Sequence, residues 1–138
     1  GLTHLFPAPS ALAALQPDDL PGPRRRAGTL IALARALAGR ELDLGPGADR
    51  TEARRTLAAL PGIGPWTVEY IAMRAWRDPD AWPASDLVLM QSIAARDPSL
   101  DRLASQKRRT EAWRPWRAYA ALHLWNDVAD RAGGARGG

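Results

Sequence analysis

Residues 60–67, which read LPGIGPWT, form a glycine-rich connection between two stretches that have the apolar spacing of helices. Glycines at positions 62 and 64 allow positive φ values and let the backbone approach a ligand closely. The second helix begins directly after them, so its unpaired N–H groups and the positive end of its dipole suit an anion. We therefore expect Gly62, Gly64 and Thr67 to grip one backbone phosphate of DNA. The alternative is a helix–helix turn that needs glycine only for its geometry.

Aromatic side chains gather close to the same connection. Trp66 and Tyr70 are four residues apart and therefore share one face of the second helix. The electron-rich face of an indole attracts cations, so this helix face suits a positively charged ring. The chain has six tryptophans, and tryptophans in a small domain commonly serve as core rings. We expect core packing for Trp76, Trp82, Trp113 and Trp116.

The elements that position these side chains are expected to be helices, because alanine, leucine and arginine dominate while valine and isoleucine are scarce. Apolar residues recur at helical spacing from 24 to 38, with Gly39 as the stop. Ser10 is placed to cap a short helix over 11–15. Asp49 and Glu52 suit a capping box for a helix that runs to about residue 60. Further helices are expected from Pro65 to about 76, from Ser85 and Asp86 through 94, within 99–113, and from 115 to about 128.

Length and composition limit the classes of protein to which the chain can belong. A chain of 138 residues is long enough for one domain with a real core, which we place at residues 1–130, and the glycine-rich residues 131–138 are expected to be a disordered tail. The absence of cysteine excludes disulfides, thiolate zinc sites and cysteine-held iron–sulfur clusters in this chain. The net charge of +4 suits a polyanion partner, although a solvated arginine-rich surface explains it equally well.

Several kinds of partner are not expected. No apolar run reaches membrane-spanning length, so we expect no membrane contact and a cytoplasmic, nucleoid-associated location. His4 and His123 lack the spacing of metal ligands, and we expect neither a metal ion nor a cofactor. His123 shares a helical stripe with Trp116 and Tyr119, which favours a packed or hydrogen-bonded imidazole.

Two segments resemble the same protein family. Residues 60–76, LPGIGPWTVEYIAMRAW, are similar to the helix-hairpin-helix of DNA-3-methyladenine glycosylase II, an alkylation-repair family of the helix-hairpin-helix glycosylase superfamily. Residues 113–125, WRPWRAYAALHLW, resemble the last helix of that family. Weaker similarity reaches upstream through 6–9 and the helix at 24, so the likeness covers nearly the whole chain to about residue 128. The resemblance implies an all-α helix-hairpin-helix glycosylase domain, of which this chain is the C-terminal part, with the hairpin at 60–66.

The resemblance also implies one catalytic acid. In the superfamily the hairpin is followed by a Gly/Pro-rich loop and an aspartate, which here correspond to residues 78–84 and Asp86. That carboxylate would stabilise the positive charge that develops on the sugar and would orient or deprotonate water. Asp86 follows Ser85 at an expected helix start, where acids are common through capping alone. Two departures stand out: Pro83 lies three residues before the acid instead of two, and Ser85 stands where near relatives have another acid. Asp78 and Asp80 are the alternative acids.

Trp66, Tyr70 and Trp125 match positions that line the base pocket of the family, which we place between the Asp86 helix and the terminal helix. Related lyases carry a lysine where this chain has Trp66, so the resemblance implies a monofunctional glycosylase that uses water. Its substrates would be alkylated bases of the 3-methyladenine and 7-methylguanine type in duplex DNA, removed by a monomer during base excision repair. Members of the family have further parts before this region, so we expect activity to need a preceding part of the protein.

Two other hypotheses stay open. A non-catalytic helix-hairpin-helix module would grip the duplex backbone and would need neither Asp86 nor the aromatic residues. A helical protein-interaction domain would show no salt-sensitive DNA binding at all.

Overall fold

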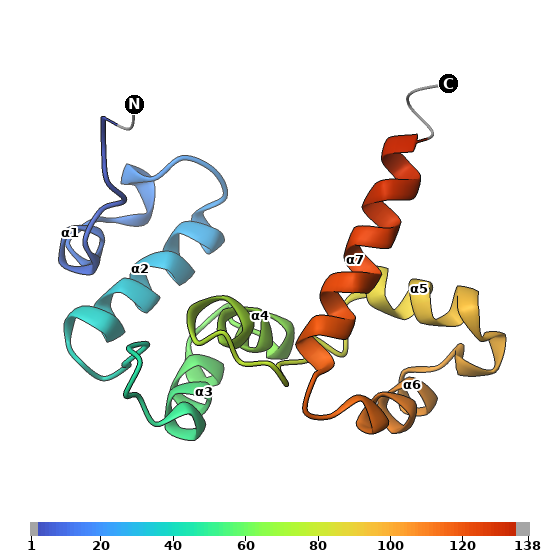
Figure 1. The fold of residues 1–138 in the computed structure, drawn as a ribbon. Helices are drawn as coiled ribbons and strands as arrows, with labels where there is room; N and C mark the ends of the chain where they lie inside the picture. Colours follow the sequence, from blue (N-terminus) through green and yellow to red (C-terminus); the bar gives the residue numbers. More distant parts are fainter. Residues whose placement is uncertain (1–2, 135–138) are drawn as a thin grey trace. The chain divides into compact units, whose positions relative to one another are not determined.

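The computed structural model describes residues 3–134, and this part of the chain contains helices, turns and loops but no strand. The all-α prediction is therefore confirmed. The α-helices are α1 (Pro9–Ala13), α2 (Arg24–Ala38), α3 (Arg50–Ala59), α4 (Pro65–Ala75), α5 (Leu87–Arg96), α6 (Leu103–Thr110) and α7 (Arg117–Gly134). Short 3-10 helices occur at η1 (Pro17–Asp19), η2 (Pro98–Leu100) and η3 (Glu111–Trp113). Figure 1 shows their order along the chain.

The helices form two compact units, one that ends at Gly64 and one that begins at Pro65. The boundary falls inside the glycine-rich connection between α3 and α4. That the two units together make one catalytic domain over residues 1–130 stays a prediction.

In the first unit, α1 packs against α2 (Figure 1). Helix α2 has the predicted bounds, because Ala27, Ile31 and Ala34 repeat at helical spacing on its buried face and Gly39 ends it. The prediction for α1 is wrong by two residues: the helix spans Pro9–Ala13 instead of 11–15, so Ser10 lies inside it and the N-cap is Ala8. Proline at the first helical position has its φ preset for a helix, which favours the earlier start.

Helix α3 is capped by Asp49, as predicted. Its carboxylate accepts hydrogen bonds from the backbone N–H groups of Thr51 and Glu52, at 2.9 and 3.1 Å. These bonds satisfy two of the N–H groups that a helix leaves free in its first turn. The side chain of Glu52 forms an ion pair with Arg55 and does not complete the predicted capping box.

In the second unit, α5 contacts both α6 and α7 (Figure 1). Helix α7 starts two residues later than predicted, at Arg117, and runs past residue 128 to Gly134. The expected disordered tail is therefore wrong for 131–134, and 135–138 lie outside the described residues. Asp127 explains part of the extension, because its carboxylate binds Arg131 one turn later and also Arg96 of α5.

The core of this second unit includes two of the tryptophans expected there, Trp76 and Trp82. Trp113 is half-buried and meets Trp82 edge to face, with 5.7 Å between ring centroids. The core prediction is wrong for Trp116, which is 58% exposed and packs at the surface against Tyr119. His123 is also exposed instead of packed. Across the described residues, every helix is too short or too polar to cross a bilayer.

Candidate active site

Asp86 lies at the N-cap of α5, directly after the loop that the sequence singled out. Its Oδ1 accepts a hydrogen bond from the backbone N–H of Leu89 at 2.9 Å. The cap explains why the helix begins at this residue, and the helix dipole favours the negative charge of the carboxylate. Asp86 therefore caps α5, as the sequence suggested.

Two indole rings bind the same carboxylate. The Nε1–H of Trp66, from the first turn of α4, donates to Oδ2 of Asp86 at 2.8 Å. The Nε1–H of Trp125, from α7, donates to Oδ1 at 3.1 Å. Both oxygens of Asp86 thus carry an indole donor, and each donor comes from a different helix. A cap needs neither of these bonds.

The rings also contact Tyr70. Trp66 and Tyr70 are stacked, with centroids 5.0 Å apart and planes at 9°. Tyr70 meets Trp125 edge to face at 6.2 Å. The structure therefore brings Trp66, Tyr70 and Trp125, which we call the aromatic trio, together around Asp86, as the family resemblance implied.

The spacing of the rings limits where a planar ligand can stack. Non-bonded carbon atoms prefer to lie about 3.5–4.0 Å apart, so a ring held between two others needs about 7 Å between their planes. Trp66 and Tyr70, with centroids 5.0 Å apart, are too close for that. The exposed part of the trio is at Tyr70, which is 37% exposed.

The surroundings of Asp86 keep it ionised. Burial raises the pKa of its carboxyl, but hydrogen bonds from the N–H of Leu89, the indoles of Trp125 and Trp66 and the N–H of Val88 outweigh burial and hold the pKa below its ordinary value. At neutral pH the group is an anion beside aromatic faces. Such an arrangement stabilises a nearby cation and does not supply a proton.

The alternative acids have other partners. Both oxygens of Asp80 are bound by Arg117, at 2.7 Å each, and one also by Arg114 at 2.5 Å. The carboxylate of Asp78 accepts the backbone N–H of Asp80 at 2.9 Å. Of the three candidate acids, Asp86 is the one that lies against the aromatic trio.

The two glycines of the connection differ. Gly62 has a φ of +85°, and a Cβ there would lie 2.1 Å from Oγ1 of Thr29 in α2, so only glycine fits. Gly64 does not take a positive φ, and a Cβ there would meet nothing within 4 Å. The expectation of positive φ is thus confirmed for Gly62 and wrong for Gly64. Thr67 lies half-buried in the first turn of α4. Phosphate binding by these residues stays a prediction.

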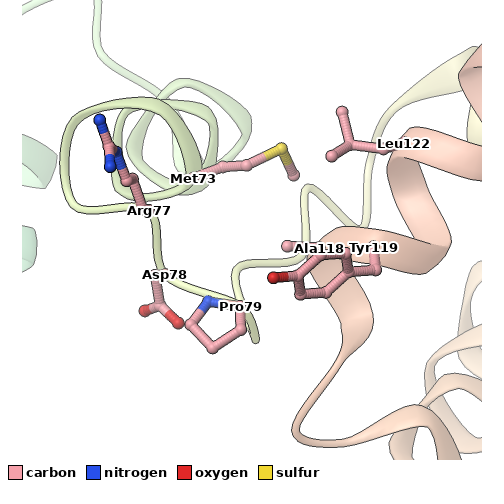
Figure 2. A pocket seen from close by; sticks show the side chains of 7 residues that line it. All are labelled: Met73, Arg77, Asp78, Pro79, Ala118, Tyr119 and Leu122. Carbon is pink, nitrogen blue, oxygen red and sulfur yellow. The ribbon is translucent and has the colours of Figure 1, made fainter.

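An apolar hollow of about 140 Å³ is lined by residues from the end of α4, the loop after it and α7, and Asp86 is not among them. Figure 2 shows Met73, Tyr119 and Leu122 lining it, with Pro79 and Asp78 from the loop at its rim. None of the aromatic trio belongs to its lining. The hollow is therefore separate from the site that the sequence predicted.

The sequence did not predict how the loop before Asp86 is held. Arg114 and Arg117 both bind Asp80. The carboxylate of Glu69 in α4 accepts the backbone N–H of Trp82 at 3.0 Å. An acid in a proline-rich loop and two arginines near the start of the last helix were the available signal, but their pairing joins residues far apart in the sequence.

No model of a protein family matches the chain. Several curated relatives do, among them the following three. The chain is 48% identical over 131 residues to the probable bifunctional transcriptional activator/DNA repair enzyme AlkA of Mycobacterium tuberculosis, a match that covers 92% of this chain and 25% of the relative. It is 38% identical over 123 residues to DNA-3-methyladenine glycosylase 2 of Escherichia coli, covering 87% of this chain and 42% of the relative. It is 31% identical over 131 residues to the DNA-3-methyladenine glycosylase of Bacillus subtilis, covering 88% and 42%.

The chain thus spans between a quarter and about two-fifths of the length of these relatives, and it matches their C-terminal portion. The helical fold agrees with that match, and so does the sequence of the hairpin region. Over most of its length, the chain is therefore similar to the C-terminal portion of DNA-3-methyladenine glycosylases.

Proposed function

We propose that this protein hydrolyses the N-glycosidic bond of alkylated bases in duplex DNA, as a monofunctional glycosylase of base excision repair. One observation carries the proposal: both carboxylate oxygens of Asp86 are held by indole N–H groups of the aromatic trio. An anion with a fixed orientation beside free aromatic faces suits a reaction in which a cationic base leaves and a cationic sugar remains.

The reaction needs the target nucleotide outside the helix, because the bond to be cut is covered by stacking in the duplex. The flipped base stacks on the aromatic trio and the sugar lies over Asp86. As the bond between sugar and base breaks, positive charge grows on the sugar, and the ionised carboxylate stabilises it. Water then attacks the anomeric carbon and loses its proton, with Asp86 as the orienting group or base.

The same groups define the substrate class. Alkylation at a ring nitrogen of a purine gives it a positive charge, and a cation is attracted to an indole or phenol face. Such a base also leaves without a proton from the enzyme, which suits a site whose one acid is ionised. We therefore infer 3-methyladenine and 7-methylguanine as substrates. Because position 66 is Trp66 and not lysine, we infer hydrolysis without strand cleavage.

The glycine-rich connection supplies the grip on the DNA backbone in this proposal. Gly62, Gly64 and Thr67 hold a phosphate at the start of α4, whose first residues include Trp66 of the site. Because the relatives are longer than this chain, we propose that a preceding part of the protein completes the duplex contacts.

The test is release of 7-methylguanine and 3-methyladenine from methylated duplex DNA. We would compare the 138-residue chain and a form extended upstream toward the length of its relatives, each with and without Asp86→Asn. Asparagine also caps helices well, so the variant removes the charge and keeps the cap. We expect the extended form to release both bases and the variant to lose about 100-fold to 1000-fold in rate.

Asp101→Asn is the matched control, because Asp101 is an exposed acid in the same compact unit. It should leave the rate unchanged. Duplex binding that both Asp86 forms share, without base release by either, would identify a non-catalytic helix-hairpin-helix module instead.

A further inference from the structure

The loop before Asp86 is fastened to the start of α7. Arg117 donates from Nε to Oδ1 of Asp80 and from Nη2 to Oδ2, at 2.7 Å each, so the pair is bidentate. The neighbouring residues are joined as well, because the backbone N–H of Ala118 donates to the carbonyl of Pro79 at 2.9 Å. We call these contacts, between Pro79–Asp80 and Arg117–Ala118, the loop–helix clamp.

The clamp is shielded from solvent. The side chains of Arg117 and Asp80 are 12% and 21% exposed, so salt and water screen this pair less than an ion pair at the surface. A bidentate guanidinium–carboxylate pair also fixes the orientation of both groups, which a single contact does not. Arg114 and Glu111 extend the network at its outer side.

Both segments that leave the clamp lead to the candidate active site. On one side the chain runs through the buried residues Ala81, Trp82 and Pro83, and the carbonyl of Pro83 accepts the backbone N–H of Asp86 at 2.9 Å. On the other side, α7 runs from Ala118 to Trp125, which are seven residues apart. That is close to two helical turns, so Ala118 and Trp125 lie on the same face of α7. Ala121, between them on this face, is fully buried.

We propose that Asp80 and Arg117 are positioning residues for base excision: the loop–helix clamp sets where Trp125 stands relative to Asp86, and thereby holds the indole N–H of Trp125 against the carboxylate. The inference rests on the proposed function for its catalytic consequence. Its geometric part concerns the contact between Trp125 and Asp86 and can be measured without any reaction.

Trp66 provides an internal control. It donates to the same carboxylate but belongs to α4. Helix α4 is held to the loop by hydrogen bonds that include those from the N–H of Trp82 to Glu69 and from the N–H of Asp78 to the carbonyl of Ala72. Neither of these two bonds involves Asp80 or Arg117. Loss of the clamp should therefore disturb the Trp125–Asp86 contact and leave the Trp66–Asp86 contact in place.

The experiment follows the indole N–H resonances of the isotope-labelled 138-residue chain while the pH is lowered from neutral. In the unmodified chain, the resonances of Trp66 and Trp125 should both titrate with Asp86, and both should lose this response in Asp86→Asn. In Asp80→Ala we expect the Trp125 resonance to lose the shift of a hydrogen-bonded indole, with that of Trp66 unchanged. Asp80→Asn keeps the shape of the side chain and should give the same change to a smaller extent. This variant can be used for the test if Asp80→Ala does not fold.

Base excision by the extended form supplies a second readout. Because Asp80 is not placed against the substrate, its loss should lower kcat by about tenfold to a hundredfold with KM for DNA nearly unchanged. Asp80→Glu should restore part of the rate, and Glu52→Gln, which removes the ion pair with Arg55 in the other compact unit, should change nothing.

Two results would overturn the inference. One is a Trp125 resonance that is the same with and without the clamp, and the other is an equal change in Trp66 and Trp125, which would indicate general loosening. If the resonances behave as expected but Asp86→Asn still excises bases at the full rate, the proposed function fails and the positioning of Trp125 stands.

Discussion

Trp125 donates its indole N–H to Asp86 at 3.1 Å, across 39 residues of sequence. Its ring also meets the ring of Tyr70, with centroids 6.2 Å apart and planes at 61°. The indole N–H orients the carboxylate, and the ring belongs to the aromatic surface on which we propose that a base stacks. The two uses can be separated by substitutions that keep the ring and remove the donor.

Trp125→Phe is the first such substitution. It keeps an aromatic face and deletes one of the hydrogen bonds that lower the pKa of Asp86, so the pKa of that carboxyl should rise. The acid limb of the rate profile for 7-methylguanine release should move to higher pH, and the rate at neutral pH should fall by roughly tenfold. Tyr70→Phe keeps a ring of nearly the same size and removes no donor to Asp86, so it should leave the acid limb in place. An unchanged acid limb in Trp125→Phe would contradict a role of the indole N–H.

The lowered pKa of Asp86 also predicts how folding stability depends on pH. The folded state holds this carboxyl below its ordinary value of 3.8, so the unfolded chain binds the proton more readily. The resulting stabilisation is present above about pH 3.8 and is lost as the pH falls through the lower pKa of the folded state. Denaturant unfolding at neutral pH and near pH 3 should show a smaller acid loss of stability in Asp86→Asn than in the unmodified chain. Equal losses would mean that the hydrogen bonds to Asp86 do not favour its ionised form.

Local features of the fold and of the candidate site followed from the sequence. The helix at 24–38 was predicted with its bounds, because its apolar spacing and Gly39 are local signals. Asp86 was expected at a helix start for the same kind of reason, and Trp66 and Tyr70 are neighbours on one helix because they are four residues apart. Their association with Trp125 came from the family resemblance, since nothing local to Trp125 points to Asp86.

What the sequence could not predict depends on contacts between distant residues. The binding of Asp80 to Arg117 spans 37 residues, and each residue alone is typical of a solvated surface. The extension of α7 to Gly134 draws on the pairing of Asp127 with Arg96 of α5, which no periodicity reveals. Trp116 was expected in the core because tryptophan usually packs there, yet it lies just before α7 at the surface. The residue type predicted a preference for the core, whereas the exposure of this ring depends on where the chain places residue 116.

The two glycines of the connection should respond differently to alanine. Gly62→Ala forces a side chain into a positive φ and against Thr29, so the free energy of unfolding should fall by about 1–3 kcal/mol. Gly64→Ala meets no neighbour and no φ strain, so stability should hold. If the backbone at Gly64 approaches a phosphate, Gly64→Ala should nevertheless weaken binding to duplex DNA, as measured by fluorescence anisotropy at fixed salt. Unchanged binding by Gly64→Ala would favour a turn in which glycine at 64 has no contact with DNA.

Selectivity for cationic bases should depend on the aromatic faces more than on Asp86. Attraction between a cation and an aromatic face contributes about 0.5–2 kcal/mol, which corresponds to roughly a twofold to thirtyfold preference over a neutral base of similar size. Tyr70→Leu keeps the two indole donors on Asp86 and removes an exposed ring, so the ratio of 7-methylguanine to hypoxanthine release should fall within that range. The acid limb of the rate profile should stay where it is, because the carboxylate keeps its hydrogen bonds. A ratio that stays constant while both rates fall together would show that Tyr70 serves only to pack Trp66 and Trp125, and that charge recognition lies elsewhere.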